Sequence, residues 1–157
     1  LVAIFYADFF PRKGKRNGAW MTSFKSQSIK DAYLPDRQGV NERPHISNVC
    51  NFTKPTETKP SLLTFNEVTT LFHEFGHGLH GMLANTTYPS LSGTSVYWDF
   101  VELPSQVMEN WCYEPEALAL FAKHYKTGEV IPQEWLQCVK LVSDYWIWLF
   151  TVTIQAI

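Results

Sequence analysis

The sequence predicts a mainly α-helical fold with a few β-strands, and three observations support this class. A long amphipathic helix is predicted over residues 64–85, and shorter helical segments follow at 115–126 and 132–142. The runs 1–10 and 45–52 are apolar or alternating, as strands are. The chain has 157 residues, of which 45% are hydrophobic and 18% charged, which is enough to bury a core.

The segments before the long helix are predicted strands and turn-rich loops. Residues 1–10, LVAIFYADFF, are apolar and aromatic, which predicts a buried strand. The basic loop PRKGKRNG follows, and residues 19–35 fit no single pattern. After the turn-rich run DAYLPDRQGVNERP, residues 45–52 alternate as a strand does, and TKPTETKPS is a loop rich in Pro and Thr.

The long helix has the clearest pattern in the chain. Thr64 and Glu67 form a T-x-x-E capping box, in which each side chain pairs with a free backbone N–H at the helix start. Asn85 is the predicted end of the helix. At about 100° per residue, one face carries the apolar side chains of Phe65, Val68, Leu71, Phe72, Phe75, Leu79 and Leu83.

A loop over residues 85–98 separates this helix from the segment DFVELPSQVMENW. Asp99 and Glu102 form a D-x-x-E helix start, but Pro104 lies too deep in the segment for a comfortable first turn. The second helix is therefore either kinked at Pro104 or begins there.

Charge and cysteine content exclude some partners and indicate a compartment. Thirteen Lys and Arg against 15 Asp and Glu give a net charge of −2, which does not support a nucleic-acid or anionic-membrane partner. The apolar run YWIWLFTVTIQAI is 13 residues long, whereas a membrane helix needs about 20. The three cysteines form no CxxC pair, which fits a reducing compartment, and we expect the cytoplasm.

The long helix carries the segment LFHEFGHGLHGML, which contains an H-E-x-x-H motif. His73 and His77 are four residues apart on one face, about 6 Å along the helix axis, so their imidazoles can converge on one cation. Glu74 lies one step round the helix, where its carboxylate can touch a metal-bound water. The motif predicts two ligands of one Zn²⁺ ion and a general base.

Two further features of this helix leave alternatives. His80 lies about 10.5 Å along the axis from His73, so it is a poor third ligand and is predicted to pack or to orient a ligand histidine. The longer motif H-E-x-x-H-x-x-G-x-x-H is excluded, because the chain has His80 and Leu83 at its last two fixed positions. Gly76 and Gly78 each lower the stability of the helix by about 1 kcal/mol relative to Ala. They are either tolerated at that cost or required for close approach of another backbone.

A catalytic zinc normally has three protein ligands, and Glu102 is the natural third. It lies 25 residues after His77, within reach after one loop. The alternative is that Glu102 only caps a helix beginning at Asp99. Glu109, seven residues further on, lies on the same face of a continuous helix and can hydrogen-bond a ligand histidine, and Asp99 is another candidate for such a supporting contact.

Several long motifs resemble one family of enzymes. The segments LFHEFGHGLHG, LSGT and DFVELPSQVMENW resemble the thimet oligopeptidase family of zinc peptidases, and FFPRKGKRNGAWM and NVCNFTKP resemble its peptidyl-dipeptidase (Dcp) branch. The resemblance covers roughly residues 1–140. It implies that His73, His77 and Glu102 bind zinc and that Glu74 is the base.

The resemblance also implies a fold and an activity. The family has a mostly helical, two-lobed, zincin-like fold with a deep channel and a small β-sheet near the metal. It cleaves short peptides, and the Dcp branch releases dipeptides from the C-terminal end. Its His- and Tyr-containing segment for transition-state stabilisation has no match here, nor does its upstream helical half.

These departures predict a fragment of a larger chain. The sequence lacks an initiator Met, and we expect residues 1–142 to be a partial catalytic domain whose N- and C-terminal parts are missing. Residues 143–157 do not resemble the family, and they are either a frameshifted end or a divergent buried strand.

The predicted function is zinc-dependent hydrolysis of short peptides, with release of C-terminal dipeptides or with internal cleavage. The alternative is a zinc-binding remnant without activity. A purely structural zinc site is disfavoured, because such sites normally have four Cys or His ligands. The substrate is expected to pair with an exposed strand edge at 45–52, although that strand is equally consistent with ordinary sheet core.

Overall fold

A computed structural model describes residues 1–32, 34, 38–132, 134–135 and 152–153. The described elements in chain order are β1 (Ile4–Asp8), β2 (Trp20–Lys25), β3 (Ser28–Lys30), β4 (Val40–Glu42), β5 (His45–Val49), β6 (Leu62–Leu63), α1 (Phe65–Met82), a 3₁₀ turn (Pro89–Leu91), α2 (Trp98–Val101), α3 (Leu103–Glu109), a second 3₁₀ turn (Asn110–Cys112), α4 (Pro115–Phe121) and β7 (Val152–Thr153).

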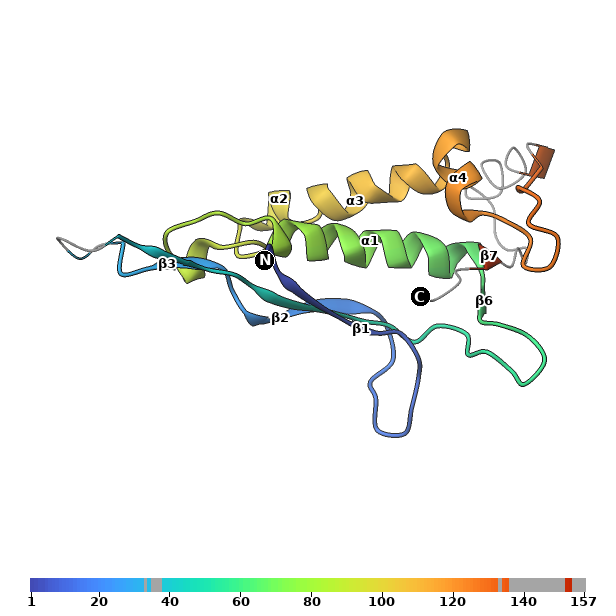
Figure 1. Cartoon of the computed structure of the whole chain (residues 1–157), viewed down its shortest axis with the longest axis horizontal. Coiled ribbons are helices and arrows are strands. Elements are labelled where there is room, and N and C mark those ends of the chain that lie inside the picture. Colours follow the sequence, from blue (N-terminus) through green and yellow to red (C-terminus); the bar gives the residue numbers. More distant parts are fainter. Residues whose placement is uncertain (33, 35–37, 133, 136–151, 154–157) are drawn as a thin grey trace.

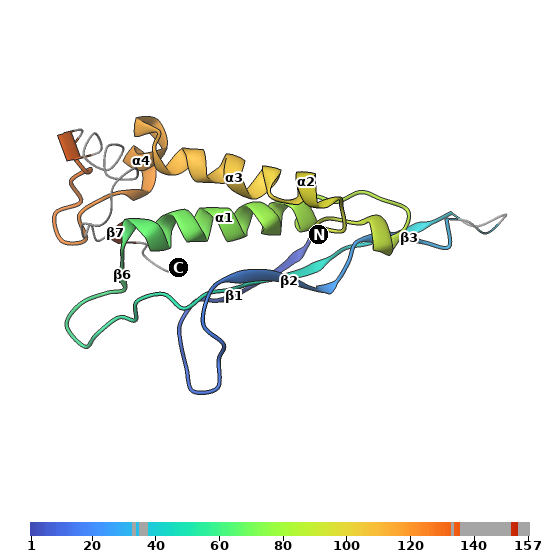
Figure 2. The ribbon, with the colours of Figure 1, turned by 180° about the vertical axis from the view of Figure 1, so that it is seen from behind.

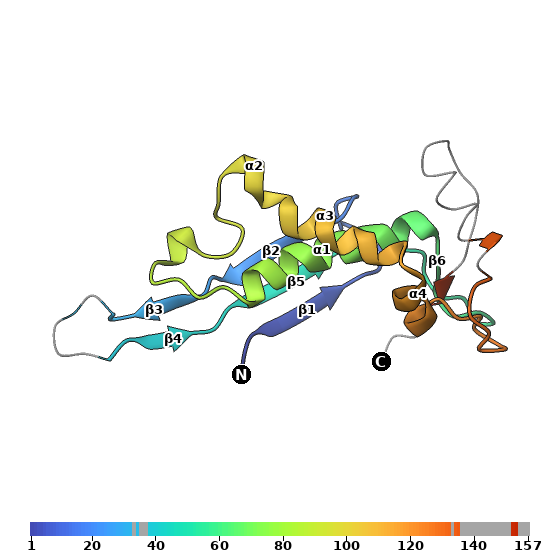
Figure 3. The ribbon, with the colours of Figure 1, turned by 90° about the horizontal axis from the view of Figure 1, so that it is seen from above.

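The chain is layered around α1. The sheet of β1, β5 and β2 lies on one side of this helix, and α3 runs along the other side (Figure 1). The β3–β4 hairpin extends the sheet region beyond the end of α1 (Figure 3). The described part is therefore mixed α/β. It has more strand than the predicted mainly α class, because Trp20–Lys25, Ser28–Lys30 and Val40–Glu42 form strands that no sequence pattern indicated.

Strand β5 is the centre of the three-stranded sheet. It pairs in parallel with β1 and antiparallel with β2, in the order β1-β5-β2. The strand predicted at 45–52 is thus confirmed over His45–Val49, but the prediction that it offers an exposed edge is wrong. Both of its edges are occupied, and Ile46, Ser47 and Asn48 are buried.

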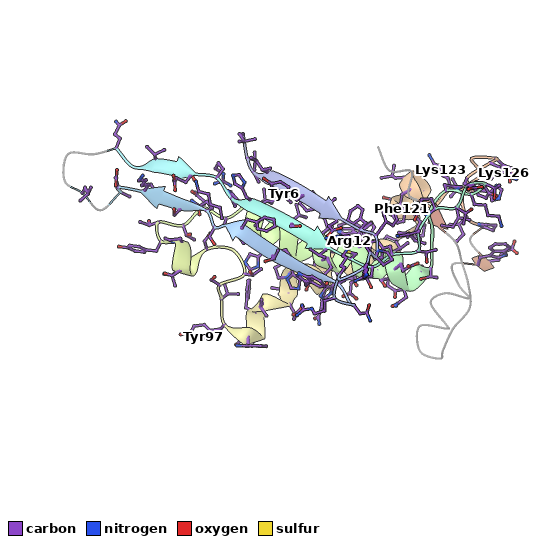
Figure 4. The ribbon with its side chains drawn as sticks, turned by 90° about the horizontal axis from the view of Figure 1, so that it is seen from below. Tyr6, Arg12, Tyr97, Phe121, Lys123 and Lys126 are labelled. Carbon is purple, nitrogen blue, oxygen red and sulfur yellow. The ribbon has the colours of Figure 1, made fainter. Side chains whose placement is uncertain are left out.

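Strand β1 is confirmed within the predicted range 1–10, but it is not buried. Phe5 is 36% exposed and Tyr6 43% exposed, because β1 lies at an edge of the sheet. One face packs on α1, where the ring of Phe5 meets the edge of Phe75 at a centroid distance of 5.6 Å. Tyr6 is on the outer face (Figure 4).

The predicted start of α1 is confirmed in atomic detail. The backbone N–H of Thr64 donates to Glu67 Oε2 at 2.7 Å, and that of Glu67 donates to Thr64 Oγ1 at 3.2 Å, which completes the capping box. The helix ends at Met82, earlier than the predicted Asn85, where Arg43 donates to the free carbonyl of Met82 at 2.7 Å. The buried core beside its first half consists of Cys50, Phe52, Leu63, Val68 and Cys112.

The segment after the loop breaks into two helices at Glu102. Helix α2 has only four residues, and α3 begins at Leu103 with Pro104 in its first turn. Proline has no backbone N–H, which costs nothing there because the N–H groups of a first turn have no acceptor within the helix. Of the two alternatives, the helix therefore begins near Pro104. This junction places the side chain of Glu102 between two helix ends rather than inside one helix.

The predictions for the remaining chain have mixed outcomes. The helix predicted at 115–126 ends at Phe121, after which Lys123 forms a β-bridge with Val130. The helix predicted at 132–142 and the tail 143–157 lie mostly outside the described residues, and the domain boundary at 142 stays a prediction. No helix in the described part of the chain combines the length and apolarity needed to cross a bilayer.

Candidate metal centre

Two imidazoles and one carboxylate meet on the face of α1 that is turned toward the α2–α3 junction. His73 Nε2 lies 3.3 Å from Glu102 Oε2, and His77 Nε2 lies 3.2 Å from the same oxygen. One ligand atom from each of the three residues lies within 4.8 Å of the other two. Helix geometry brings the histidines together, whereas Glu102 arrives from the other side of a loop.

The close packing of α3 on α1 depends on Gly76. A Cβ added at this position would lie 2.6 Å from the carbonyl oxygen of Pro104 and 2.6 Å from the Cα of Ser105. Glycine is therefore required at position 76 so that the backbone of α3 can approach α1. This confirms, for Gly76, the prediction of close approach by another backbone. At Gly78 the nearest atom to an added Cβ is a side-chain oxygen at 3.4 Å, so that interpretation does not extend to Gly78.

The carboxylate of Glu102 is held in place by its own helix. Ser105 is fully buried, and its Oγ lies 2.8 Å from Glu102 Oε2 and 2.8 Å from the Glu102 carbonyl oxygen. Glu102 makes no side-chain capping bond to the backbone of α3. The alternative that Glu102 only caps a helix is wrong, because its carboxylate points at the two histidines.

Glu109 supports His73 from two turns further along α3. His73 Nδ1 lies 2.6 Å from Glu109 Oε1. An ionised carboxylate has no proton to donate, so Nδ1 is the donor in this bond. The Nε2 atom of the neutral ring then carries a lone pair on the side of Glu102, which is the form that a metal ligand needs.

Glu74 is nearly enclosed beside this cluster, at 7% exposure. Burial raises the pKa of its carboxyl group, a positive charge on a protonated His73 would oppose this shift, and the negative charge of Glu102 adds to it. A hydrogen bond with the backbone of Met21, on β2, also favours the ionised form. A carboxylate whose pKa is raised is a better proton acceptor than one with an ordinary pKa.

The cluster opens into a cavity of about 530 Å³ between β2 and the segment that leads into α2. Glu74, His77 and Glu102 line its polar part. Trp20 and Met21 of β2 form one wall of it, and the opposite wall comprises Thr94, Val96, Trp98 and Val101. The candidate ligand atoms are therefore accessible to a molecule that lies along β2.

Two of the predicted supporting residues lie outside this arrangement. His80 packs edge-on against Phe100 with ring centroids 6.0 Å apart, and it is not among the clustered metal-ligating side chains of the described residues. Asp99 is exposed, and within the described ranges it makes no hydrogen bond or ion pair with either histidine. Burial lowers the pKa of the His80 ring, which fits a packed histidine.

The comparisons with known proteins agree with this geometry. The family model described as peptidase family M3 matches residues 1–152. The chain belongs to peptidase family M3. The match confirms the family that the sequence motifs predicted.

The curated relatives that the chain matches carry three kinds of name. Oligopeptidase A of Escherichia coli (strain K12) is 48% identical over 147 residues, which cover 93% of this chain and 21% of that protein. Dipeptidyl carboxypeptidase of the same strain is 44% identical over 142 residues, covering 90% of this chain and 20% of that protein. Mitochondrial intermediate peptidase of Yarrowia lipolytica is 41% identical over 152 residues, which cover 87% of this chain and 20% of that protein. The chain thus spans about a fifth of the length of the curated relatives it matches.

The donor set of this M3 chain fits a small divalent metal ion. Ligand atoms about 2.0–2.1 Å from a tetrahedral zinc lie about 3.3 Å from one another. The two separations between histidine nitrogens and Glu102 Oε2, 3.3 and 3.2 Å, agree with that spacing. Two histidines and one glutamate also form a donor set known from catalytic zinc sites.

Sequence reasoning missed two residue groups that shape this M3 site. The first is β2 with Trp20 and Met21, whose segment AWMTSFK is rich in strand-forming residues but lacks clean alternation. The second is Ser105, for which no sequence signal existed, because its contact depends on the break between α2 and α3.

Proposed function

We propose that this chain carries the metal-binding part of a peptidase that hydrolyses peptide bonds in short peptides. His73, His77 and Glu102 would hold one Zn²⁺ ion, which when bound polarises the scissile carbonyl and acidifies water. The observation that carries the proposal is the approach of Glu102 Oε2 to both histidines, at 3.3 and 3.2 Å, with the buried Glu74 beside them.

The residues around the metal have distinct tasks in this proposal. Glu74 accepts a proton from the attacking water at its carboxylate and returns it to the leaving amine. Glu109 fixes the tautomer and orientation of His73 through the bond of 2.6 Å to Nδ1. Ser105 fixes the rotamer of Glu102 through its 2.8 Å contact with Oε2.

The substrate is proposed to bind along β2 rather than along 45–52. Within the described sheet, β2 has β5 on one side and no strand on the other, and the cavity lies beside it. An extended peptide can add to such an edge through main-chain hydrogen bonds, with its side chains in adjacent pockets. Trp20 and Met21 then border the scissile bond from one side.

The relatives' names suggest two modes of cleavage, and the sequence motifs favour one. Relatives are named dipeptidyl carboxypeptidase and oligopeptidase A at 44 and 48% identity. We propose release of C-terminal dipeptides, with internal cleavage as the other mode. We further propose a cytoplasmic location on the sparse cysteines; the relatives' names include both a cytosolic and an organellar oligopeptidase A.

A second candidate is a zinc-binding remnant without turnover. The described residues that line the cavity include no Tyr, Arg or Lys that could stabilise the oxyanion. Loss of one such donor typically lowers the rate by about 10²–10³. This candidate predicts the same zinc affinity as the peptidase but no hydrolysis.

Zinc content and hydrolysis, measured together on the same preparations, test the proposal. The chain, E74Q, H77A and H80A are analysed for bound zinc and for cleavage of an internally quenched peptide. The peptidase proposal predicts turnover that a chelator abolishes and zinc restores, with zinc but no turnover in E74Q. H77A should lose the zinc, whereas the matched control H80A should keep it, because His80 is outside the cluster.

The outcomes separate the candidates. Zinc without turnover in the unmodified chain supports the remnant. Turnover retained by E74Q contradicts the assignment of Glu74 as the base. Equal zinc loss in H77A and H80A contradicts the proposed ligand set.

A further inference from the structure

The loop between β1 and β2 leads directly into one wall of the cavity at the candidate metal centre. It spans residues 9–19, and seen from behind it projects away from α1 (Figure 2). Its last residue, Ala19, lines the cavity together with Trp20 and Met21, the first two residues of β2. Any contact that fixes the end of this loop therefore also fixes the position of that wall.

The two halves of the loop are held by different contacts. In the first half, Lys15 Nζ donates to the carbonyl oxygens of Asp8 and Phe10 at 2.8 and 2.9 Å, and Arg12 Nη1 lies 2.6 Å from Asp8 Oδ1. In the second half, Gly18 has a φ of +98°, and a Cβ added there would meet no atom within 4 Å. Packing at Gly18 therefore does not hold the end of the loop.

The side chain of Asn51 holds this second half instead. Its Nδ2 atom donates to the carbonyl oxygen of Arg16 at 2.9 Å and to that of Gly18 at 2.8 Å. Both N–H groups of the amide are thus used, on the two sides of Asn17. A side-chain amide offers two donors on one nitrogen, whereas the carboxylate of the same shape offers none.

Asn51 extends the pairing of β2 with β5 beyond the end of the sheet. The two strands are antiparallel, and Trp20 pairs with Val49 at this end. Two residues further along the same register, Gly18 lies opposite Asn51. Side-chain hydrogen bonds therefore replace backbone ladder bonds at the point where the loop leaves the sheet.

The backbone that carries Asn51 is anchored in the core. Its neighbours Cys50 and Phe52 are buried members of the main core cluster. Their backbone N–H groups donate to the carbonyl oxygens of Asp8 and Phe9, both at 2.8 Å. Because side chains alternate along an extended segment, Asn51 points away from the core and toward the loop. The loop is thus tied to a rigid part of the molecule.

A further contact carries this constraint from the loop to the cavity wall. The guanidinium carbon of Arg16 lies 4.5 Å from the centroid of the Trp20 ring. Such stacking is weak at an exposed site, so it does not by itself fix the loop. The hydrogen bond from Asn51 to the Arg16 carbonyl oxygen orients this residue, and the Trp20 ring is then oriented by the stacked guanidinium.

We propose that Asn51 is a positioning residue of the site, whose amide fixes the end of the β1–β2 loop and thereby the Ala19–Trp20 wall that a bound peptide contacts. The inference rests on the proposed peptidase function, which supplies the peptide. Within the described ranges, the Asn51 side chain hydrogen-bonds only to the loop and is not part of the metal cluster. Its loss should therefore weaken peptide binding and leave metal binding unchanged.

The position of Trp20 tests the first step without any metal. N51D keeps the shape of the side chain but replaces both donors with acceptors, and N51A removes the donors without adding a charge. N17D is the matched control, because it makes the same chemical change at an exposed residue of the same loop. The fluorine resonance of 5-fluorotryptophan at Trp20, assigned with W20F, should shift in N51D and N51A but not in N17D. Circular dichroism verifies that the variants are folded.

Two hydroxamates test the second step on the zinc-loaded chain. Acetohydroxamate reaches only the metal, whereas the hydroxamate of Phe-Ala also extends along the wall. By calorimetry, N51D and N51A should bind the dipeptide hydroxamate about tenfold more weakly than the unmodified chain, as expected for the loss of two hydrogen bonds. Affinity for acetohydroxamate and for zinc should not change, whereas a merely destabilised site would weaken both hydroxamates equally. N17D should behave as the unmodified chain.

Each outcome either supports or overturns the inference. An unmoved Trp20 resonance in N51D and N51A overturns the role of Asn51 in fixing the loop. A shifted resonance with unchanged affinity for the dipeptide hydroxamate overturns the role of the wall in peptide binding. Equal losses for both hydroxamates, or the same loss in N17D, overturn the assignment of Asn51 as a positioning residue. A chain that binds no zinc contradicts the proposed function and the peptide step with it, whereas the Trp20 resonance still decides the first step.

Discussion

Replacement of Gly76 by alanine tests whether close packing of α3 on α1 creates the candidate metal centre. The added Cβ would lie 2.6 Å from the Pro104 carbonyl oxygen and from the Ser105 Cα, both of which are backbone atoms that cannot rotate away. To lengthen these separations from 2.6 Å to an ordinary contact of about 3.5 Å, helices α1 and α3 must move apart by about 0.9 Å. Glu102 lies at the start of α3 and moves with it.

The magnitude follows from two opposing terms. Alanine in place of glycine favours the helix by about 1 kcal/mol. Overpacking against fixed backbone costs about 1–3 kcal/mol, so the net change in the free energy of unfolding is a loss of about 0–2 kcal/mol. The effect on the metal is larger, because ligand distances tolerate only about ±0.2 Å. We expect zinc affinity to fall at least about tenfold in Gly76→Ala.

Gly78→Ala is the matched control on the same helix. Its added Cβ meets only side-chain atoms, at 3.4 Å or more, so the helix gains about 1 kcal/mol without a clash. Urea unfolding measures stability, and competition with a chromophoric chelator measures zinc affinity. If Gly76→Ala binds zinc as tightly as Gly78→Ala does, the helix contact does not position Glu102.

Two other predictions follow from single contacts. E109A should lower zinc affinity by about 10- to 100-fold without abolishing binding, because His73 loses the partner that lies 2.6 Å from its Nδ1. Unchanged affinity in the chelator competition would contradict the proposed role of Glu109 in supporting His73. Cys50 and Cys112 should resist iodoacetamide at pH 8 in the folded chain and react in urea, because burial raises the pKa of each thiol to about 12. Peptide mass spectrometry detects the labelled cysteines, and labelling of the folded chain would contradict their burial.

Local patterns predicted the local parts of the site correctly. The capping box at Thr64 and Glu67 forms as its sequence indicates, because both partners lie within one helical turn. The proximity of His73 and His77 follows from helix periodicity alone. The position of Glu109 relative to Glu102 also followed from spacing, since Glu102 directly precedes α3 and Glu109 is the last residue of that helix.

Non-local pairing accounts for the wrong or missing predictions. Residues 45–52 have the alternation of a strand, but alternation does not reveal how many neighbours a strand has, and β5 turned out to be central. Segment β2 was not predicted because its strand character depends on pairing with β5, including an irregular register between Ser23 and Lys25. Strand neighbours come from distant parts of the chain, and only tertiary structure specifies them.

By itself, the sequence determined the helix that carries H-E-x-x-H, its start, and the proximity of its two histidines, because each of these depends on residues a few positions apart. Only the tertiary structure decided that Glu102 reaches both histidines, that Gly76 permits this approach, and that β2 pairs on one side only among the described strands. These features depend on how α3 and the sheet pack on α1. Such packing arises from contacts between distant segments, which a linear pattern does not encode.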